Sequence, residues 1–168
     1  MQRRTLLKLG VGATVLMVLA GGGVALVQPG VVGGRLTESG CGVMQAVARA
    51  VLDGVLPSDG PARQRALLAH LVRLDSAITE FPLPIQGELS QLLALLAVPP
   101  GRLALAGLSA AWSDADVAEL QTALQDMRTA SLALKQQAYH ALRDLTNAAY
   151  FSDASAWLSL GYPGPIAI

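Results

Sequence analysis

The side chains that most often perform acid–base chemistry or bind metals are sparse in this chain. It has two histidines, His70 and His140, one cysteine, Cys41, and twelve Asp and Glu residues among 168. Neither histidine has a second His, Cys or Glu at the spacing that metal ligands on one helix require. No P-loop, Gly-x-Ser-x-Gly, Cys-x-x-Cys or dinucleotide-binding glycine motif is present. The sequence therefore predicts no catalytic residue, no metal site and no cofactor site in this chain.

Cys41 is the only cysteine, so no disulfide can form within the chain. In an oxidising compartment an odd cysteine indicates an intermolecular disulfide, a lipid attachment or a buried thiol. Ser39-Gly40-Cys41 has the small residues of a lipidation site, but Glu38 stands where an apolar residue is required. The sequence favours a buried thiol and leaves an intermolecular disulfide at Cys41 as the alternative.

The N-terminus has the charge pattern of an export signal. The positive segment Arg3-Arg4-Thr5-Leu6-Leu7-Lys8 is followed by an apolar, glycine-rich stretch with no charged residue before Arg35. A positive segment, an apolar segment and small residues in this order are typical of exported proteins. The segment resembles a twin-arginine (Tat) signal. The residues that match this signal are Arg3, Arg4, Leu7 and Lys8, whereas Gln2 and Leu6 replace its usual Ser/Thr and Phe.

Residues 1–27 have two interpretations, a Tat signal peptide or an anchor that stays on the chain. The 19 residues from Leu9 to Val27 would form a helix about 28 Å long, which matches the hydrocarbon core of a bilayer. The positive residues before this stretch keep the N-terminus in the cytoplasm. Both interpretations predict a periplasmic location, free after export through the Tat pathway or anchored to the inner membrane.

The charge balance argues against nucleic acid as a partner. Lys and Arg number 12 and Asp and Glu number 12, so the chain is formally neutral. Without Arg3, Arg4 and Lys8, 9 basic residues face 12 acidic ones, which leaves a net charge of −3. Nucleic-acid binding requires clustered positive charge, which this chain lacks.

Beyond residue 27 the sequence predicts a flexible tether over 28–41 and a compact all-α domain over 42–168. Prolines and glycines mark the tether and separate the helical segments, and no alternating β pattern appears. We expect a bundle of four to five helices, over about 42–56, 61–80, 85–97 and, more weakly, 102–108. The fourth long helix begins near Ser113 with the capping-box-like Ser113–Asp116. Its apolar residues then recur at steps of three and four as far as Leu145.

Aromatic residues gather near the C-terminus. Four of the seven aromatic side chains lie between residues 150 and 162, and Asp153 is the only charged residue after Leu145. The chain closes with an irregular Pro/Gly tail that cannot be helical throughout. Tyr and Trp are favoured at protein interfaces. The predicted partner-docking residues are Tyr150, Phe151, Trp157, Tyr162, Pro163 and Pro165; the alternative is that this tail folds back and closes the helical core.

Together with the export signal, three short landmarks resemble the gluconate 2-dehydrogenase subunit 3 family. The first is Val55-Leu56-Pro57-Ser58-Asp59 and the second is Leu74-Asp75. The third is Ala149-Tyr150-Phe151, followed by Trp157 and Gly161-Tyr162-Pro163-Gly164-Pro165. The chain lacks the longer Pro-Gly-Ala segment that often follows the first landmark in this family.

The resemblance implies a non-catalytic small subunit of a periplasmic dehydrogenase. In such complexes a large flavoprotein of the glucose-methanol-choline oxidoreductase family carries FAD and lacks an export signal. The small subunit takes it through the Tat translocase as a folded passenger, and a cytochrome c subunit or another acceptor takes the electrons. Arg3 and Arg4 would then contact the translocase, and the aromatic tail would dock the flavoprotein. A stand-alone exported helical protein with a binding or structural role is the alternative.

Overall fold

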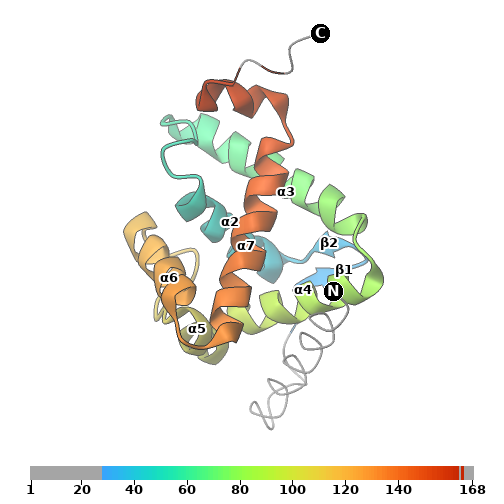
Figure 1. The fold of residues 1–168 in the computed structure, drawn as a ribbon, viewed down its shortest axis with the longest axis vertical. Coiled ribbons are helices and arrows are strands. Elements are labelled where there is room, and N and C mark those ends of the chain that lie inside the picture. Colours follow the sequence, from blue (N-terminus) through green and yellow to red (C-terminus); the bar gives the residue numbers. More distant parts are fainter. Residues whose placement is uncertain (1–27, 163, 165–168) are drawn as a thin grey trace.

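The computed structural model describes residues 28–162 and 164, and Figure 1 shows its fold. A two-stranded hairpin, β1 (Val31–Val32) and β2 (Arg35–Leu36), precedes six α-helices and one short 3-10 helix. The helices are α2 (Glu38–Val51), α3 (Gly60–Thr79), α4 (Leu83–Ala97), α5 (Pro99–Ala106), α6 (Val117–Thr129), α7 (Ala133–Phe151) and η2 (Ala154–Leu160). The predicted all-α bundle is confirmed, with six α-helices in the described part of the chain. The predictions for residues 1–27, and those for Pro163 and Pro165, lie outside the described residues.

Helix α2 forms the centre of the bundle, because it packs against α3, α4, α6 and α7. Its Val43, Met44, Val47 and Ala48 are at most 1% exposed. Alanines at alternate positions on this helix let the neighbouring backbones approach closely, so one helix can serve four partners.

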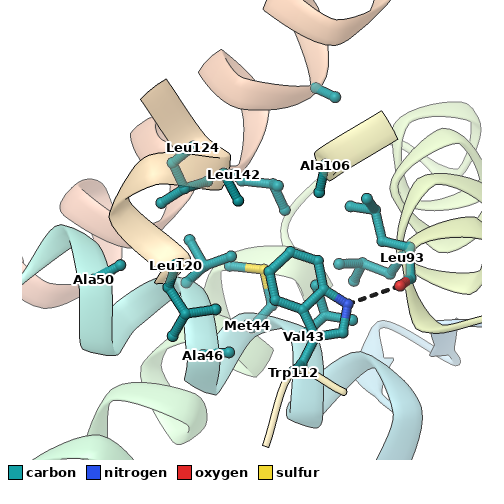
Figure 2. Close-up of a cluster of buried hydrophobic side chains, with 14 of the residues drawn as sticks. Val43, Met44, Ala46, Ala50, Leu93, Ala106, Trp112, Leu120, Leu124 and Leu142 are labelled. Carbon is teal, nitrogen blue, oxygen red and sulfur yellow. Dashed lines mark hydrogen bonds between the residues drawn. The ribbon is translucent and has the colours of Figure 1, made fainter. Parts of the chain in front are cut away.

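Trp112 is part of the hydrophobic core between these helices. Figure 2 shows its indole ring among Val43, Met44, Leu93 and Leu120. The ring nitrogen Nε1 donates a hydrogen bond of 2.7 Å to the backbone carbonyl of Leu96. This bond removes the cost of burying an indole N–H, so a tryptophan that is 5% exposed is accommodated in the core.

The helix starts follow local rules that the sequence makes visible. The Asp59 carboxylate accepts a hydrogen bond from the Ala62 amide at the start of α3, and Pro61 occupies the first turn. At α6 a capping box is present, but Asp116 is the N-cap in place of Ser113. The Glu119 amide donates to Asp116 Oδ1 at 2.8 Å, and the Asp116 amide donates to Glu119 Oε2 at 2.9 Å.

The prediction of a single long helix from about 113 to 145 is wrong. The chain leaves the helical conformation at Ala130 and Leu132, whose ψ angles are 146° and 111°. This break separates α6 from α7, and α7 turns back to pack against α6 and α2. A helix of that length would extend about 50 Å and leave much of its apolar face in water.

The prediction of a flexible tether over 28–41 is also wrong. Residues 31–36 form the hairpin, in which Val31 pairs with Leu36 and Val32 with Arg35. Helix α2 begins at Glu38, four residues earlier than expected, because Thr37 caps it by accepting a hydrogen bond from the Gly40 amide. Strand β1 packs on α4 and β2 packs on α3, so this segment is part of the folded domain.

Within the described residues, no single helix is both long and apolar enough to cross a bilayer. Helices α4 and α5 meet the length and composition criteria only as a pair, and they are bent by 100° at Val98. The bend has a local cause. Val98 precedes Pro99, and a residue before proline is driven out of the helical region.

Candidate functional site

Among the described residues, the His, Cys, Asp and Glu side chains that could bind a metal do not gather in one cluster. In the part of the chain that the structure describes, no group of three or more His, Cys, Asp or Glu could hold a metal ion. His140 is exposed on α7 with its ring 5.1 Å from that of Tyr139. His70 lies on α3 and is completely buried. His70 and His140 therefore lie on different helices, α3 and α7, as the sequence predicted.

His70 is the most unusual of these residues. Its ring is 0% exposed, and neither Nδ1 nor Nε2 has a hydrogen-bond partner. Burial, and the positive charge of Arg73, lower its pKa to about 4, so the ring is neutral at pH 7. Thr146 on the facing helix α7 is also fully buried with an unpaired hydroxyl. The α3–α7 contact thus holds two polar side chains whose hydrogen bonds the described chain does not satisfy.

Cys41 is half-buried near the start of α2. Burial raises the pKa of its thiol, and the negative charge of Asp75 raises it further. Since the thiolate is the reactive form, both effects reduce the reactivity of Cys41 in disulfide exchange. An intermolecular disulfide at this position stays a prediction.

The predicted docking residues of the tail take different positions. Tyr150 is 7% exposed and belongs to a second core cluster with Leu52, Leu56 and Leu67. Phe151 and Trp157 are half-buried, and the indole Nε1 of Trp157 donates to the Phe151 carbonyl at 2.8 Å.

Tyr162 is 48% exposed, and its ring centroid lies 5.5 Å from that of Trp157. Tyr150 therefore packs into the core, as one interpretation of the tail expected, whereas partner docking at the exposed Tyr162 stays a prediction.

Arg73 joins this aromatic end to the bundle. Its Nε donates to the Ala149 carbonyl at 3.0 Å, and Nη1 lies 3.2 Å from Asp153 Oδ2. The guanidinium carbon lies 5.8 Å from the centre of the Tyr150 ring, a cation–π distance. One α3 side chain thus contacts the last turn of α7, the ring of Tyr150 and Asp153, the residue that precedes η2.

Asp153 completes the junction from the other side. Its Oδ1 accepts hydrogen bonds from the Ser155 amide and hydroxyl, at 2.9 and 2.8 Å, which orders the first turn of η2. These two bonds, and then the charge of Arg73, lower the pKa of Asp153. The sequence marked Asp153 only as an isolated charge in an uncharged stretch, and it contained no signal for Arg73. Their pairing depends on the packing of α3 against α7, which sequence spacing does not contain.

The geometry gives an aromatic surface at one end of the bundle, built from Phe151, Trp157 and Tyr162 and fixed by Arg73 and Asp153. Comparison with known proteins adds no relative: no family model matches the chain, and no curated protein or solved structure is significantly similar to it.

Proposed function

We propose that this chain is the non-catalytic small subunit of a periplasmic dehydrogenase whose large subunit is an FAD-dependent flavoprotein of the glucose-methanol-choline family. Residues 1–27 supply the Tat signal, with Arg3, Arg4, Leu7 and Lys8 contacting the translocase. The chain carries the flavoprotein as a folded passenger, and a cytochrome c subunit or another acceptor takes the electrons from FAD. The three landmarks in the sequence support the identity of this partner.

The observation that carries the docking part of the proposal is the exposed Tyr162 ring, which lies tilted against the ring of Trp157. Aromatic side chains dominate the energetics of protein interfaces because they bring large apolar area with few rotatable bonds. Here the hydrogen bond from Trp157 to Phe151 and the Arg73–Asp153 ion pair hold the segment before binding. A surface that is already ordered loses little conformational entropy on association, which favours a stable complex.

Replacing Arg3 and Arg4 with lysine should leave the partner's dehydrogenase activity in the cytoplasm. Lysine keeps the positive charge but lacks the planar guanidinium donors, so a site that recognises two arginines would lose its ligand. The measurement is dehydrogenase activity in periplasmic and cytoplasmic fractions of the native cell. The matched control is Arg35→Lys, which changes an arginine outside the signal. Undiminished activity in the periplasm of the double variant would contradict the carrier role.

Replacing Tyr162 with alanine should weaken binding of the flavoprotein about tenfold or more, the range of an aromatic anchor at an interface. The measurement is the Kd of the purified subunits by calorimetry. Leu132→Ala is the control, because Leu132 is similarly exposed at 54% but precedes the other end of α7. If Tyr162→Ala and Leu132→Ala leave the same Kd, the aromatic end is not the docking surface.

Recovery of the tagged full chain from its native cell tests the partner itself. A much larger protein that co-purifies and shows the absorption bands of bound flavin would support the proposal. A colourless chain that elutes alone under gentle conditions would contradict it and favour the stand-alone exported protein.

A further inference from the structure

Helices α4 and α5 differ from the other α-helices in having no charged residue at their exposed positions. Their exposed residues are Leu83, Pro84, Gly87, Gln91, Pro99, Pro100, Leu103 and Ala104. By contrast, the exposed positions of α6 and α7 include Glu119, Asp126, Arg128, Arg143 and Asp144. We call the first set the α4–α5 face. Leu83 is 80% exposed and Leu103 is 57% exposed, so apolar groups stand out from this face into the surroundings.

Two charged residues lie on these helices, Glu88 and Arg102, and neither is among the exposed ones. Glu88 is half-buried, and Arg102 is 8% exposed. The guanidinium of Arg102 donates to the carbonyls of Leu108 and Ser109, both at 3.2 Å, so its charge points into the domain. A surface of this composition can leave water without the large desolvation cost of burying a charge.

The chain enters the domain directly on α4. The Gly30 amide donates to the Ser90 carbonyl at 3.2 Å. The Ser90 hydroxyl accepts from the Val31 amide at 3.1 Å and donates to the Val31 carbonyl at 3.0 Å. From the other side, Thr37 donates its amide to the Gly30 carbonyl and its hydroxyl to the Pro29 carbonyl. Residues 29–31 are thus bonded to both α4 and the start of α2, and we call this the Gly30–Ser90 junction.

This junction limits how far the domain can lie from a membrane anchor that ends at Val27. Three residue steps separate Val27 from Gly30, and a fully extended chain of that length spans about 10 Å. A free tether over 28–41 would instead have reached about 45 Å. If Leu9 to Val27 spans a bilayer, the polar layer beyond the hydrocarbon core is roughly 6 Å thick. Gly30 and the part of α4 bonded to it therefore stay at, or within a few ångströms of, the lipid headgroups.

We propose that the α4–α5 face lies against the surface of the lipid bilayer and is held there by the Gly30–Ser90 junction. The occupant is lipid because the chain outside the described residues ends next to α4 and its apolar stretch has the length of a membrane span. The inference requires that residues 1–27 stay on the chain. It does not require a flavoprotein partner, so it stands or falls separately from the proposed function.

The same geometry places the aromatic end far from the bilayer. Figure 1 shows η2 at the opposite end of the molecule from α4 and α5. Helix α7 connects the two ends and is 19 residues long, which corresponds to about 28 Å. With the α4–α5 face on the membrane, Trp157 and Tyr162 point into the periplasm, where a large partner can reach them.

Depth-dependent quenching tests this orientation on the full chain in phosphatidylcholine vesicles that contain a headgroup nitroxide lipid. Cys41→Ser removes the only cysteine, and Gln91→Cys or Ala154→Cys then places one fluorophore on the α4–α5 face or on η2. We expect about threefold stronger quenching at position 91, because only that position lies within about 10 Å of the headgroups. Equal quenching at the two positions, or release of a shortened chain from the vesicles, would overturn the proposal.

A second variant separates the junction from the composition of the face. Insertion of twenty Gly/Ser residues between 27 and 28 keeps the apolar stretch but allows the domain to move about 25 Å away. The difference in quenching between positions 91 and 154 should then fall to near zero. If the full difference persists in this variant, the junction does not set the orientation, and that part of the proposal is wrong.

Discussion

Replacing Gly30 with alanine should lower the free energy of unfolding by about 3 kcal/mol, the upper part of the range for overpacking a tight contact. An added Cβ would overlap the Cβ of Leu93 and would lie 3.0 Å from the Ser90 carbonyl oxygen and 3.1 Å from the Ala94 amide nitrogen. Two of these three neighbours are backbone atoms of α4, which cannot move without disturbing the helix. The hairpin would have to lift from α4 and give up the hydrogen bonds of the Gly30–Ser90 junction.

Urea denaturation of the full chain followed by far-ultraviolet circular dichroism measures this effect. Gly87→Ala is the matched control, because Gly87 lies on the same helix α4 and a Cβ there meets nothing within 4 Å. That substitution should raise stability by about 0.5–1 kcal/mol, since alanine is the better helix former. If Gly30→Ala matched the wild-type midpoint and slope, the close contact between the hairpin and α4 would be wrong.

The stability of the domain should fall by about 2 kcal/mol between pH 8 and pH 5 because of His70 alone. Its pKa is about 4 in the folded state against 6.5 for the free side chain. Below pH 6.5 the unfolded chain binds a proton that the folded chain does not, so acid favours unfolding until pH reaches the folded value. The full loss, about 3 kcal/mol, is reached near pH 4, and above pH 7 the contribution is complete.

His70→Leu isolates this contribution. It removes the titrating ring and both unpaired nitrogens, so its stability at pH 7.5 should stay within about 1 kcal/mol of the wild type. Between pH 8 and pH 5 the variant should lose less stability than the wild type. The difference between the two curves of unfolding free energy against pH is the contribution of His70. His140→Leu serves as the control, because His140 is exposed on α7. Parallel profiles for wild type and His70→Leu would show that His70 titrates normally.

The proposed function and the proposed orientation use opposite ends of one bundle. The aromatic end depends on Arg73 and Asp153, whereas the α4–α5 face depends on the Gly30–Ser90 junction. Because the two ends share no residue, Tyr162→Ala should not change the quenching at position 91, and Gln91→Cys should not change the Kd for the flavoprotein.

Local chemistry made several parts of the fold predictable. The start of α3 follows from Asp59 and Pro61, and the end of α4 follows from Pro99 and Pro100, because caps and prolines act within one turn of the chain. The all-α class follows from apolar residues at steps of three and four without an alternating pattern. The aromatic composition of residues 150–162 was also visible in the sequence, and the docking role assigned to these residues stays a prediction.

Other features needed contacts between residues far apart in the chain. The break between α6 and α7 contains no glycine or proline, and it exists because α7 buries its apolar face only by turning back onto α2 and α6. Residues 31–36 form a hairpin because α3 and α4 offer surfaces for its strands, although a two-residue strand has little propensity of its own. Likewise, the sequence does not indicate which of Tyr150 and Tyr162 is buried. Tyr150 is buried because Arg73 and Leu67 pack around it, whereas Tyr162 stays exposed. Propensities and caps act over a few residues, whereas burial is decided by surfaces that meet only after the chain has folded.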